Sequence, residues 1–340
     1  MAAERLACLI CARNLGDAAI QSGFLRRLAD RGYARQYLVW TRPQVAFLFE
    51  QIPGCEVIGS QFPVGTNKQF GVSAAMQLLA AAAAIRRRSP SVTLDLLGDF
   101  RERLLARLIG APRHLHIGWA PGHLFNNLIR NPFGPGQPVV TVPAGQPNIY
   151  AAYGLLLDTL APPVGETAGQ VPASAAKDQS IRHVGLHPFA SQECKLWPQE
   201  KWRELTAGLL AGGLEVSMFG APAERARVLE ILGDLAPRVH VVCEPLQNFV
   251  RYIAGLDVLV GLDSFSVHVA GSQGVRTVMI NAGNDPRLWS PPPPAVTLAD
   301  SGGCLHYPCF NVPRCEGTAA EYVCVRSITV SQVTKAIGAS

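Results

Sequence analysis

One stretch of the chain, 260–271 with the sequence VGLDSFSVHVAG, combines several groups that can do chemistry. An apolar run ends at Leu262, Asp263 and Ser264 follow it, and His268 comes five residues after the aspartate. If a strand ends and a helix begins here, the first amide groups of that helix lack intrahelical partners and can hold an anion. The alternative is an ordinary capped helix that carries His268 as a packing residue.

Two further polar clusters lie where apolar runs end in the second half of the chain. The segment 187–202, HPFASQECKLWPQEKW, holds Ser191 and Lys195 before an expected helix. A hydroxyl, an ammonium group and loop amides can together hold a phosphate, whereas the alternative is a solvated loop lysine. In 219–224, FGAPAE, Glu224 can accept hydrogen bonds from a ribose, although the helix dipole alone favours an acid there.

The first half of the chain offers one comparable cluster, the segment NLGD at 14–17. Its glycine permits a tight turn, and Asp17 stands near the start of an expected helix. Aspartate is a preferred N-cap residue, so a structural role is the commoner one. A carboxylate at this place can also act as a general base, which is the less common role.

These clusters are connected by alternating apolar strands and amphipathic helices. Such alternation predicts parallel, doubly wound sheets, in which ligands bind beyond the carboxyl ends of the strands. No Gly-x-Gly-x-x-Gly follows any expected strand, which disfavours a dinucleotide-binding domain. The expected strands are 5–12, 36–41, one within 43–59, 92–98 and 114–120, and then 183–190, 215–221, 239–244, 258–262 and 276–283.

The alternation is interrupted twice, and the interruptions define the expected domains. Residues 121–150 are rich in Pro, Gly and Asn and are expected to form an extended loop region. Residues 161–180 are a weakly hydrophobic stretch typical of a linker. We therefore expect an N-terminal domain at 1–160, a linker at 161–180 and a C-terminal domain at 181–340.

The composition describes a well-buried globular protein with a small excess of positive charge. The 340 residues are 48% hydrophobic and 16% charged, with a formal charge of +5. That charge suits an anionic ligand or peripheral association with the inner membrane, but not nucleic-acid binding. The start of the chain is too polar for a signal peptide, and the Ala-rich window 74–85 is too short to span a bilayer. A cytoplasmic protein is expected.

Nine cysteines are present, and four of them crowd near the C-terminus. An odd number without a secretion signal argues against a disulfide scaffold. Four thiolates on a loop broken by Pro and Gly can form a tetrahedral Zn or Fe site, although the spacing lacks a Cys-x2-Cys pair. Four reduced thiols are the alternative. The candidate ligands are Cys304, Cys309, Cys315 and Cys324.

Taken in order, these clusters resemble glycosyltransferase family 9, the ADP-heptose:lipopolysaccharide heptosyltransferases. The matching pieces are NLGDAAIQSGFLRRL, IPGCEVI, DLLGDFRERLLARLIGA, HPFAS with KLWPQEKW, FGAPAE, and DSFSVHVAGSQGVRTVMINAGNDPRLWSP. The resemblance implies a GT-B fold, with two Rossmann-like domains whose parallel sheets face each other across a cleft. The N-terminal domain would bind the acceptor and the C-terminal domain an ADP-sugar.

The resemblance also implies a role for each candidate residue. Asp17 matches the general base of an inverting transfer. The resemblance therefore favours a catalytic role for Asp17 over a helix-capping role. The donor would be bound by Ser191, Lys195, Glu224, Asp263, Ser264 and His268. No metal or other cofactor is implied for the transfer itself, and some protein-modifying relatives hold iron in the Cys-rich segment. Two residues depart from the family pattern, since Ala190 replaces a hydroxyl and Phe265 replaces a glycine.

The implied function is transfer of a sugar, heptose in the family, to a hydroxyl of the lipopolysaccharide core. A protein hydroxyl is the alternative acceptor, as in autotransporter-modifying relatives. The departures at Ala190 and Phe265 keep a second class open, a non-catalytic GT-B protein that binds sugar nucleotides. A GT-B epimerase or hydrolase of nucleotide sugars is a third.

Overall fold

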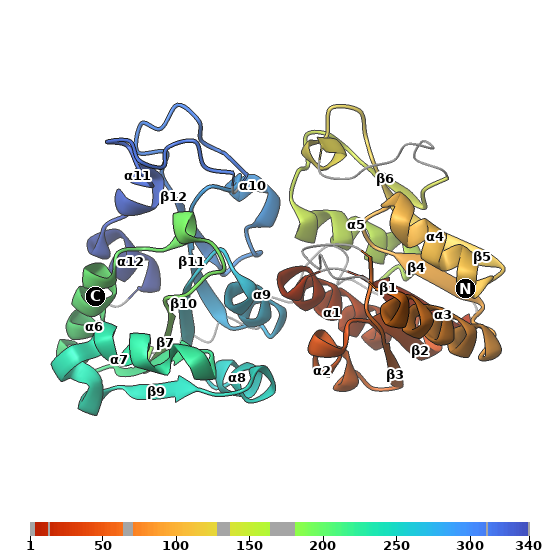
Figure 1. Ribbon diagram of the computed structural model, residues 1–340, viewed down its shortest axis with the longest axis horizontal. Coiled ribbons are helices and arrows are strands. Elements are labelled where there is room, and N and C mark those ends of the chain that lie inside the picture. Colours follow the sequence, from red (N-terminus) through yellow and green to blue (C-terminus); the bar gives the residue numbers. More distant parts are fainter. Residues whose placement is uncertain are drawn as a thin grey trace. The chain divides into compact units, whose positions relative to one another are not determined.

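The computed structural model describes residues 4–12, 14–63, 71–127, 137–163, 181–310 and 312–338. The chain divides into two compact units, 1–170 and 171–340. Each unit contains its own six-stranded sheet, and every strand pairing recorded in these two sheets is parallel. Figure 1 shows the elements of both units.

The first unit has the strand order β3-β2-β1-β4-β5-β6. Its strands are β1 (Glu4–Cys11), β2 (Ala34–Thr41), β3 (Cys55–Gly59), β4 (Val92–Asp95), β5 (Arg113–Trp119) and β6 (Val140–Val142). Its α-helices are α1 (Leu15–Asp30), α2 (Phe47–Glu50), α3 (Val72–Arg87), α4 (Phe100–Ile109) and α5 (Ile149–Leu160).

The apolar face of each helix in this unit packs on the sheet or on a neighbouring helix. Ile10 of β1 and Trp40 of β2 share one buried cluster with Ile85 of α3 and Ile109 of α4. The helices α1 and α5 pack against each other, and so do α3 and α4. The sequence also determines where helices begin: the Asp99 side chain accepts a hydrogen bond from the N–H of Arg101 at the start of α4.

The second unit has the strand order β12-β11-β10-β7-β8-β9. Its strands are β7 (His183–His187), β8 (Glu215–Gly220), β9 (His240–Cys243), β10 (Val258–Leu262), β11 (Arg276–Asn281) and β12 (Val296–Ala299). Its α-helices are α6 (Gln199–Ala211), α7 (Arg225–Leu232), α8 (Leu246–Ile253), α9 (Phe265–Ser272), α10 (Pro286–Trp289), α11 (Val323–Arg326) and α12 (Val330–Ile337).

The predicted α/β class with parallel sheets is confirmed, and the expected strands are present with small shifts at their ends. One prediction was wrong: the segment 121–150 is not loop throughout, because β6 pairs with β5 as the edge strand of the first sheet. A three-residue strand is too short to give a readable alternation. Residues 128–136 of that segment, and 164–180 of the predicted linker, lie outside the described residues.

Besides the short helices α10 and α11, two elements at the end of the chain were not predicted from the sequence. These are β12, which extends the second sheet beyond β11, and α12, which follows a capping box between Thr329 and Gln332. Strand β12 is only half-buried, so its residues do not form the apolar run that marked the central strands.

The turn between β4 and α4 gives a prediction about stability. Gly98 has a φ of 72°, and a Cβ atom at this position would lie 2.2 Å from the carbonyl oxygen of Ile117. The N–H groups of Leu97 and Gly98 both donate to Asp95 Oδ1 at 2.9 Å, so the backbone has little freedom to move away. We expect Gly98→Ala to lower the free energy of unfolding by about 3 kcal/mol or more, measured by urea denaturation.

Gly32→Ala is the matched control, because Gly32 has a φ of 66° but no heavy atom within 4 Å of an added Cβ. It should cost only the left-handed strain of about 1 kcal/mol. Equal losses in the two variants would show that the contact with Ile117 is not what requires glycine at position 98.

Candidate functional site

The central feature of the second unit is the reversal of its strand order between β10 and β7. Strands β8 and β9 continue the sheet on one side of this point, and β11 and β12 continue it on the other. In open α/β sheets such a switch point is where ligands bind, beyond the carboxyl ends of the strands. Lys195 follows β7 and Asp263 follows β10, so the structure brings these two predicted residues together at the switch point.

Asp263 is held by a buried network of hydrogen bonds. Its side chain is 5% exposed and that of Lys195 is 12% exposed. Lys195 Nζ donates to Asp263 Oδ2 at 2.9 Å and to the Asp263 carbonyl oxygen at 3.0 Å. Asn284 Nδ2 also donates to Oδ2, and His268 Nε2 lies 3.8 Å from Oδ1. Donors from three segments of chain therefore converge on one carboxylate.

This network determines the charge of Asp263. Burial alone raises the pKa of a carboxyl group, because it disfavours the charged form. Here the contact with His268 and the positive charge of Lys195 outweigh burial, and the pKa of Asp263 lies well below its ordinary value. The carboxylate is therefore ionised at neutral pH. It holds the Lys195 ammonium beside the turn that connects β10 to α9.

A second polar contact at this place was not predicted. His187, the last residue of β7, pairs in register with Gly261 of β10, and its Nδ1 lies 3.1 Å from Ser266 Oγ. Burial lowers the pKa of His187 to about 4, so the imidazole is neutral at pH 7. Its place at the carboxyl end of an expected strand, at the start of the segment that holds Ser191 and Lys195, was the one available signal.

The helix α9 begins with Ser264 as its N-cap residue, and the Ser264 side chain makes no capping hydrogen bond. Ser264 Oγ instead lies 3.4 Å from Ser266 Oγ. The Phe265 ring stacks on Phe249 of α8, with ring centroids 6.1 Å apart and an interplanar angle of 25°. Phe265, the residue that fits the family pattern least, therefore has a packing partner on the neighbouring helix.

Two predicted donor residues lie on the same edge of the sheet without joining the Asp263 network. Ser191 is exposed in the loop after β7. Glu224 ends the 3-10 turn Pro222–Glu224 after β8, and its Oε2 accepts a hydrogen bond from the N–H of Ala221 at 2.7 Å. This contact supports the interpretation of Glu224 as an ordinary acid at the start of a helix. Binding of a ribose by Glu224 stays a prediction.

Asp17 belongs to the first unit, where it also follows a strand at a switch point. The order of that sheet reverses between β1 and β4, and Asp17 lies in the first turn of α1, directly after β1. The N-cap residue is Asn14, so the interpretation of Asp17 as the cap was wrong. Burial, and then the charge of Asp17, raise the pKa of Tyr153 on α5, which places the carboxylate near that phenol.

The Cys-rich segment packs against the loop that carries Asn284. The Asn281 side chain donates to the Tyr307 hydroxyl at 2.9 Å, and the N–H of Phe310 donates to the Gly283 carbonyl at 2.7 Å. A small pocket behind this loop is lined by five thiols, those of Cys194, Cys304, Cys309, Cys315 and Cys324. The structure thus brings the four predicted cysteines together and adds Cys194, the neighbour of Lys195.

The thiols are gathered but not arranged around one point. Among the described residues, no three Cys, His, Asp or Glu side chains form a group that could hold a metal ion. Cys315 Sγ instead accepts a hydrogen bond from the N–H of Tyr322 at 3.5 Å. Binding of Zn or Fe would require these side chains to move toward each other, so the metal site stays a prediction.

Comparison with known proteins decides the family. The model of glycosyltransferase family 9 (heptosyltransferase) matches residues 149–319, which is half of the chain and includes the whole Asp263 network. The chain belongs to glycosyltransferase family 9. A curated relative, lipopolysaccharide heptosyltransferase 1 of Escherichia coli K12, is 27% identical over 106 residues. That alignment covers 31% of this chain and only a third, 33%, of the relative.

The similarity to solved structures covers nearly the whole length of this family 9 chain. A family 9 glycosyltransferase from Veillonella parvula has a TM-score of 0.69 at 17% identity and covers 99% of this chain and 97% of its own. The E. coli heptosyltransferase WaaC, solved with ADP, has a TM-score of 0.68 at 15% identity, with 98% and 99% covered. The same enzyme solved with ADP-2-deoxy-2-fluoro heptose gives 0.67 at 16%, with 98% and 99% covered. The fold is GT-B, as predicted.

The neutral His187 gives a prediction about the pH dependence of stability. Its folded pKa of about 4 lies below the ordinary 6.5, so the unfolded chain takes up the proton first as the pH falls. Stability is therefore lost between pH 6.5 and pH 4, and the His187 contribution at pH 5 is about 2 kcal/mol relative to pH 8. We expect urea denaturation to show a smaller loss from pH 8 to pH 5 in His187→Gln than in the wild type, by about that amount.

The same two measurements contain their own control, because the other titrating groups contribute equally to both proteins. Identical losses of stability from pH 8 to pH 5 in the wild type and His187→Gln would contradict the assignment of a neutral, partly buried imidazole.

Proposed function

We propose that this protein is an inverting glycosyltransferase that transfers heptose from ADP-heptose to a hydroxyl acceptor. The observation that carries the proposal is the buried Lys195–Asp263 pair at the switch point of the second sheet, in a chain that belongs to the heptosyltransferase family. The donor class is supported by the neighbouring WaaC structures, which were solved with ADP and with a fluorinated ADP-heptose.

In this proposal the second unit binds the diphosphate of the donor. Two of the three ammonium donors of Lys195 are used by Asp263, which leaves the third for a phosphate oxygen. The first amides of α9 and the hydroxyls of Ser191 and Ser264 add neutral donors. His268, one turn into α9, borders the same space. These fixed groups would stabilise the charge that develops on the departing ADP.

The remaining donor contacts would come from the neighbouring strand. Glu224 lies after β8 and would accept hydrogen bonds from the ribose hydroxyls, provided that its contact with the N–H of Ala221 leaves one carboxylate oxygen available. Lys195 and the helix amides supply the positive partners of the diphosphate, so the proposed transfer uses no metal ion.

Asp17 is the proposed general base. Its carboxylate takes the proton of the acceptor hydroxyl as that oxygen attacks the anomeric carbon of the donor. The bond from the anomeric carbon to the phosphate oxygen breaks in the same displacement, and ADP leaves with the electron pair. A single displacement inverts the anomeric configuration. The acceptor would be a lipopolysaccharide core sugar or, as the alternative, a protein hydroxyl.

The transfer is tested most simply with Asp17→Asn, which keeps the shape of the side chain and removes its basicity. We expect release of ADP from ADP-heptose in the presence of a competent acceptor to fall by about 100-fold or more, since general bases contribute at least that much. Binding of ADP, measured by isothermal titration calorimetry, should be unchanged. Asp30→Asn, at the other end of α1, is the matched control and should keep full activity.

Three outcomes would contradict the proposal, each in a different way. Full turnover by Asp17→Asn would remove the assigned base. Release of ADP by the wild type without any acceptor would indicate a hydrolase. Tight binding of ADP-heptose with no turnover on either class of acceptor would indicate a binding protein.

A further inference from the structure

The small pocket behind the loop that carries Asn284 collects thiols that the proposed transfer does not use. Cys194 and the four cysteines of the C-terminal segment line it together. Cys194 is 5% exposed, whereas Cys309 is only half-buried. The two come from segments that are far apart in the chain, so a covalent bond between them would connect parts of the fold that are otherwise joined by noncovalent contacts.

Within this pocket, Cys309 is the best-suited partner of Cys194. Burial raises the pKa of the Cys194 thiol, and after burial the largest contribution comes from Cys309, ahead of that from Cys324. Electrostatic effects decline with distance, so Cys309 lies near Cys194. Cys315 already has a partner, because its Sγ accepts the hydrogen bond from the N–H of Tyr322.

The Cys194 side of the pocket is connected directly to the buried ion pair of the candidate site. Cys194 and Lys195 are consecutive residues of the short 3-10 turn Glu193–Lys195. The peptide bond fixes the distance between consecutive Cα atoms at about 3.8 Å, so the Lys195 backbone follows any movement of Cys194. A bridge at Cys194 would thus shift the ammonium relative to Asp263, to which it donates at 2.9 Å.

The Cys309 side of the pocket is connected to another donor of the same carboxylate. The N–H of Phe310, the residue after Cys309, donates to the Gly283 carbonyl at 2.7 Å. Asn284 follows Gly283 in the chain, and its Nδ2 donates to Asp263 Oδ2. A bridge at Cys309 would therefore displace a second group that holds Asp263.

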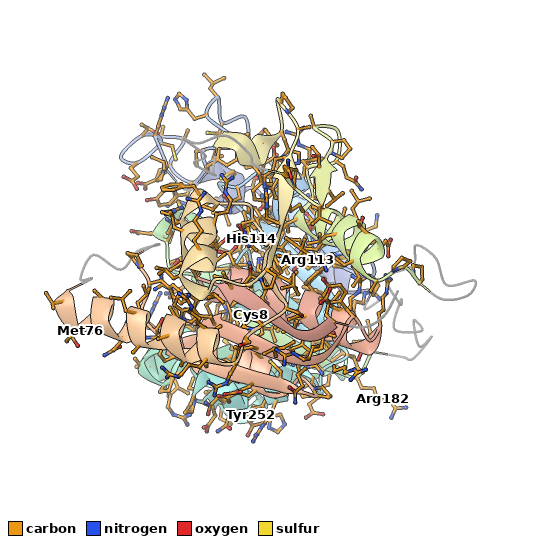
Figure 2. The ribbon with its side chains drawn as sticks, turned by 90° about the vertical axis from the view of Figure 1, so that its right-hand side faces the viewer. Cys8, Met76, Arg113, His114, Arg182 and Tyr252 are labelled. Atoms are coloured by element: carbon orange, nitrogen blue, oxygen red, sulfur yellow. The ribbon has the colours of Figure 1, made fainter. Side chains whose placement is uncertain are left out.

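The segment around Cys309 can change its position at low cost. Residues 300–310 and 312–322 contain no helix or strand, and Leu305 is 95% exposed. Segments with few regular hydrogen bonds and little packing open more easily than a sheet. The contrast is with Cys8 and Cys11, which are fully buried in β1, and Figure 2 shows Cys8 among the strands of the first unit.

We propose that Cys194 and Cys309 form a reversible disulfide bridge that weakens binding of the donor diphosphate. The oxidant is a small disulfide such as oxidised glutathione. The thiolate of Cys309, the more exposed of the two, attacks one sulfur of this disulfide and releases one glutathione. The thiolate of Cys194 then attacks the Cys309 sulfur, and the second glutathione leaves with the electron pair. Two electrons pass from the protein thiols to the oxidant, and the two thiol protons end on the two glutathiones.

The effect of this bridge on binding rests on the proposed function, because it acts through Lys195 and its diphosphate. Closing the bridge draws the Cys-rich segment out of its position in the reduced protein. Strained disulfides are the ones that thiols reduce most readily, so the change is reversible. The reduced protein is the form that binds the donor, and the oxidised protein is the weakened form.

The test compares the reduced protein with the protein oxidised by glutathione disulfide. Peptide mapping by mass spectrometry should find the Cys194–Cys309 bridge. Isothermal titration calorimetry should give an affinity for ADP at least about fivefold lower, since a charge-assisted hydrogen bond is displaced, and dithiothreitol should reverse the loss. Cys309→Ser should keep its affinity in glutathione disulfide. Without ADP, amide hydrogen exchange at residues 193–195 and 283–284 should become faster on oxidation.

Cys55→Ser is the matched control, because Cys55 is also half-buried but belongs to β3 of the first unit. It should respond to glutathione disulfide like the wild type. Absence of the Cys194–Cys309 bridge, an unchanged affinity of the bridged protein, or an equal response of Cys309→Ser would overturn the proposal. So would a metal ion that occupies the pocket thiols and prevents their oxidation.

Failure of the proposed function gives a different result. The reduced wild type would then not bind ADP at all. Peptide mapping and hydrogen exchange, which need no ligand, would still decide whether the bridge forms and displaces the two loops.

Discussion

The candidate site depends on one interaction, the buried pair of Lys195 and Asp263. A carboxylate that is 5% exposed is costly to ionise unless its charge is compensated. Lys195 in the loop after β7, Asn284 in the loop after β11 and His268 within α9 supply that compensation. Because each donor comes from a different segment, the charge on Asp263 fixes the positions of the loops that form the edge of the sheet.

The sheet topology explains why these groups meet although they are far apart in the chain. Strands β7 and β10 are neighbours only because the strand order reverses between them, and this brings residues 195 and 263 to one place. The first unit repeats the arrangement, with Asp17 after β1 beside the reversal toward β4. Each unit thus presents its candidate residues at the one place where two loops diverge and leave room for a ligand.

The sequence predicted this edge of the sheet better than it predicted the contacts within it. Apolar runs followed within about five residues by Asp or Lys point to Asp17, Lys195 and Asp263, because buried parallel strands and polar loops differ sharply in composition. Two contacts at this edge were harder to predict. Asn284, which donates to Asp263, resembles any loop amide, and His187, which contacts Ser266, resembles the end of a strand. Their roles follow from strand pairing, such as the register of His187 with Gly261, which the local pattern does not contain. The short strand β6 and the half-buried β12 escaped prediction for a related reason, since neither is apolar over enough residues to show a period.

The central claim, that Lys195 is held by Asp263 in order to bind a diphosphate, is tested most directly by the affinity for ADP of two variants. Lys195→Met alone leaves a buried carboxylate without its cation, whereas Lys195→Met/Asp263→Asn removes both charges and separates stability from binding. Lys335→Met, an exposed lysine of α12, is the control. In isothermal titration calorimetry we expect both Lys195 variants to bind ADP at least about tenfold more weakly than the wild type and the control, with the double variant recovering stability but not affinity. Wild-type affinity for ADP in the folded double variant would contradict the claim.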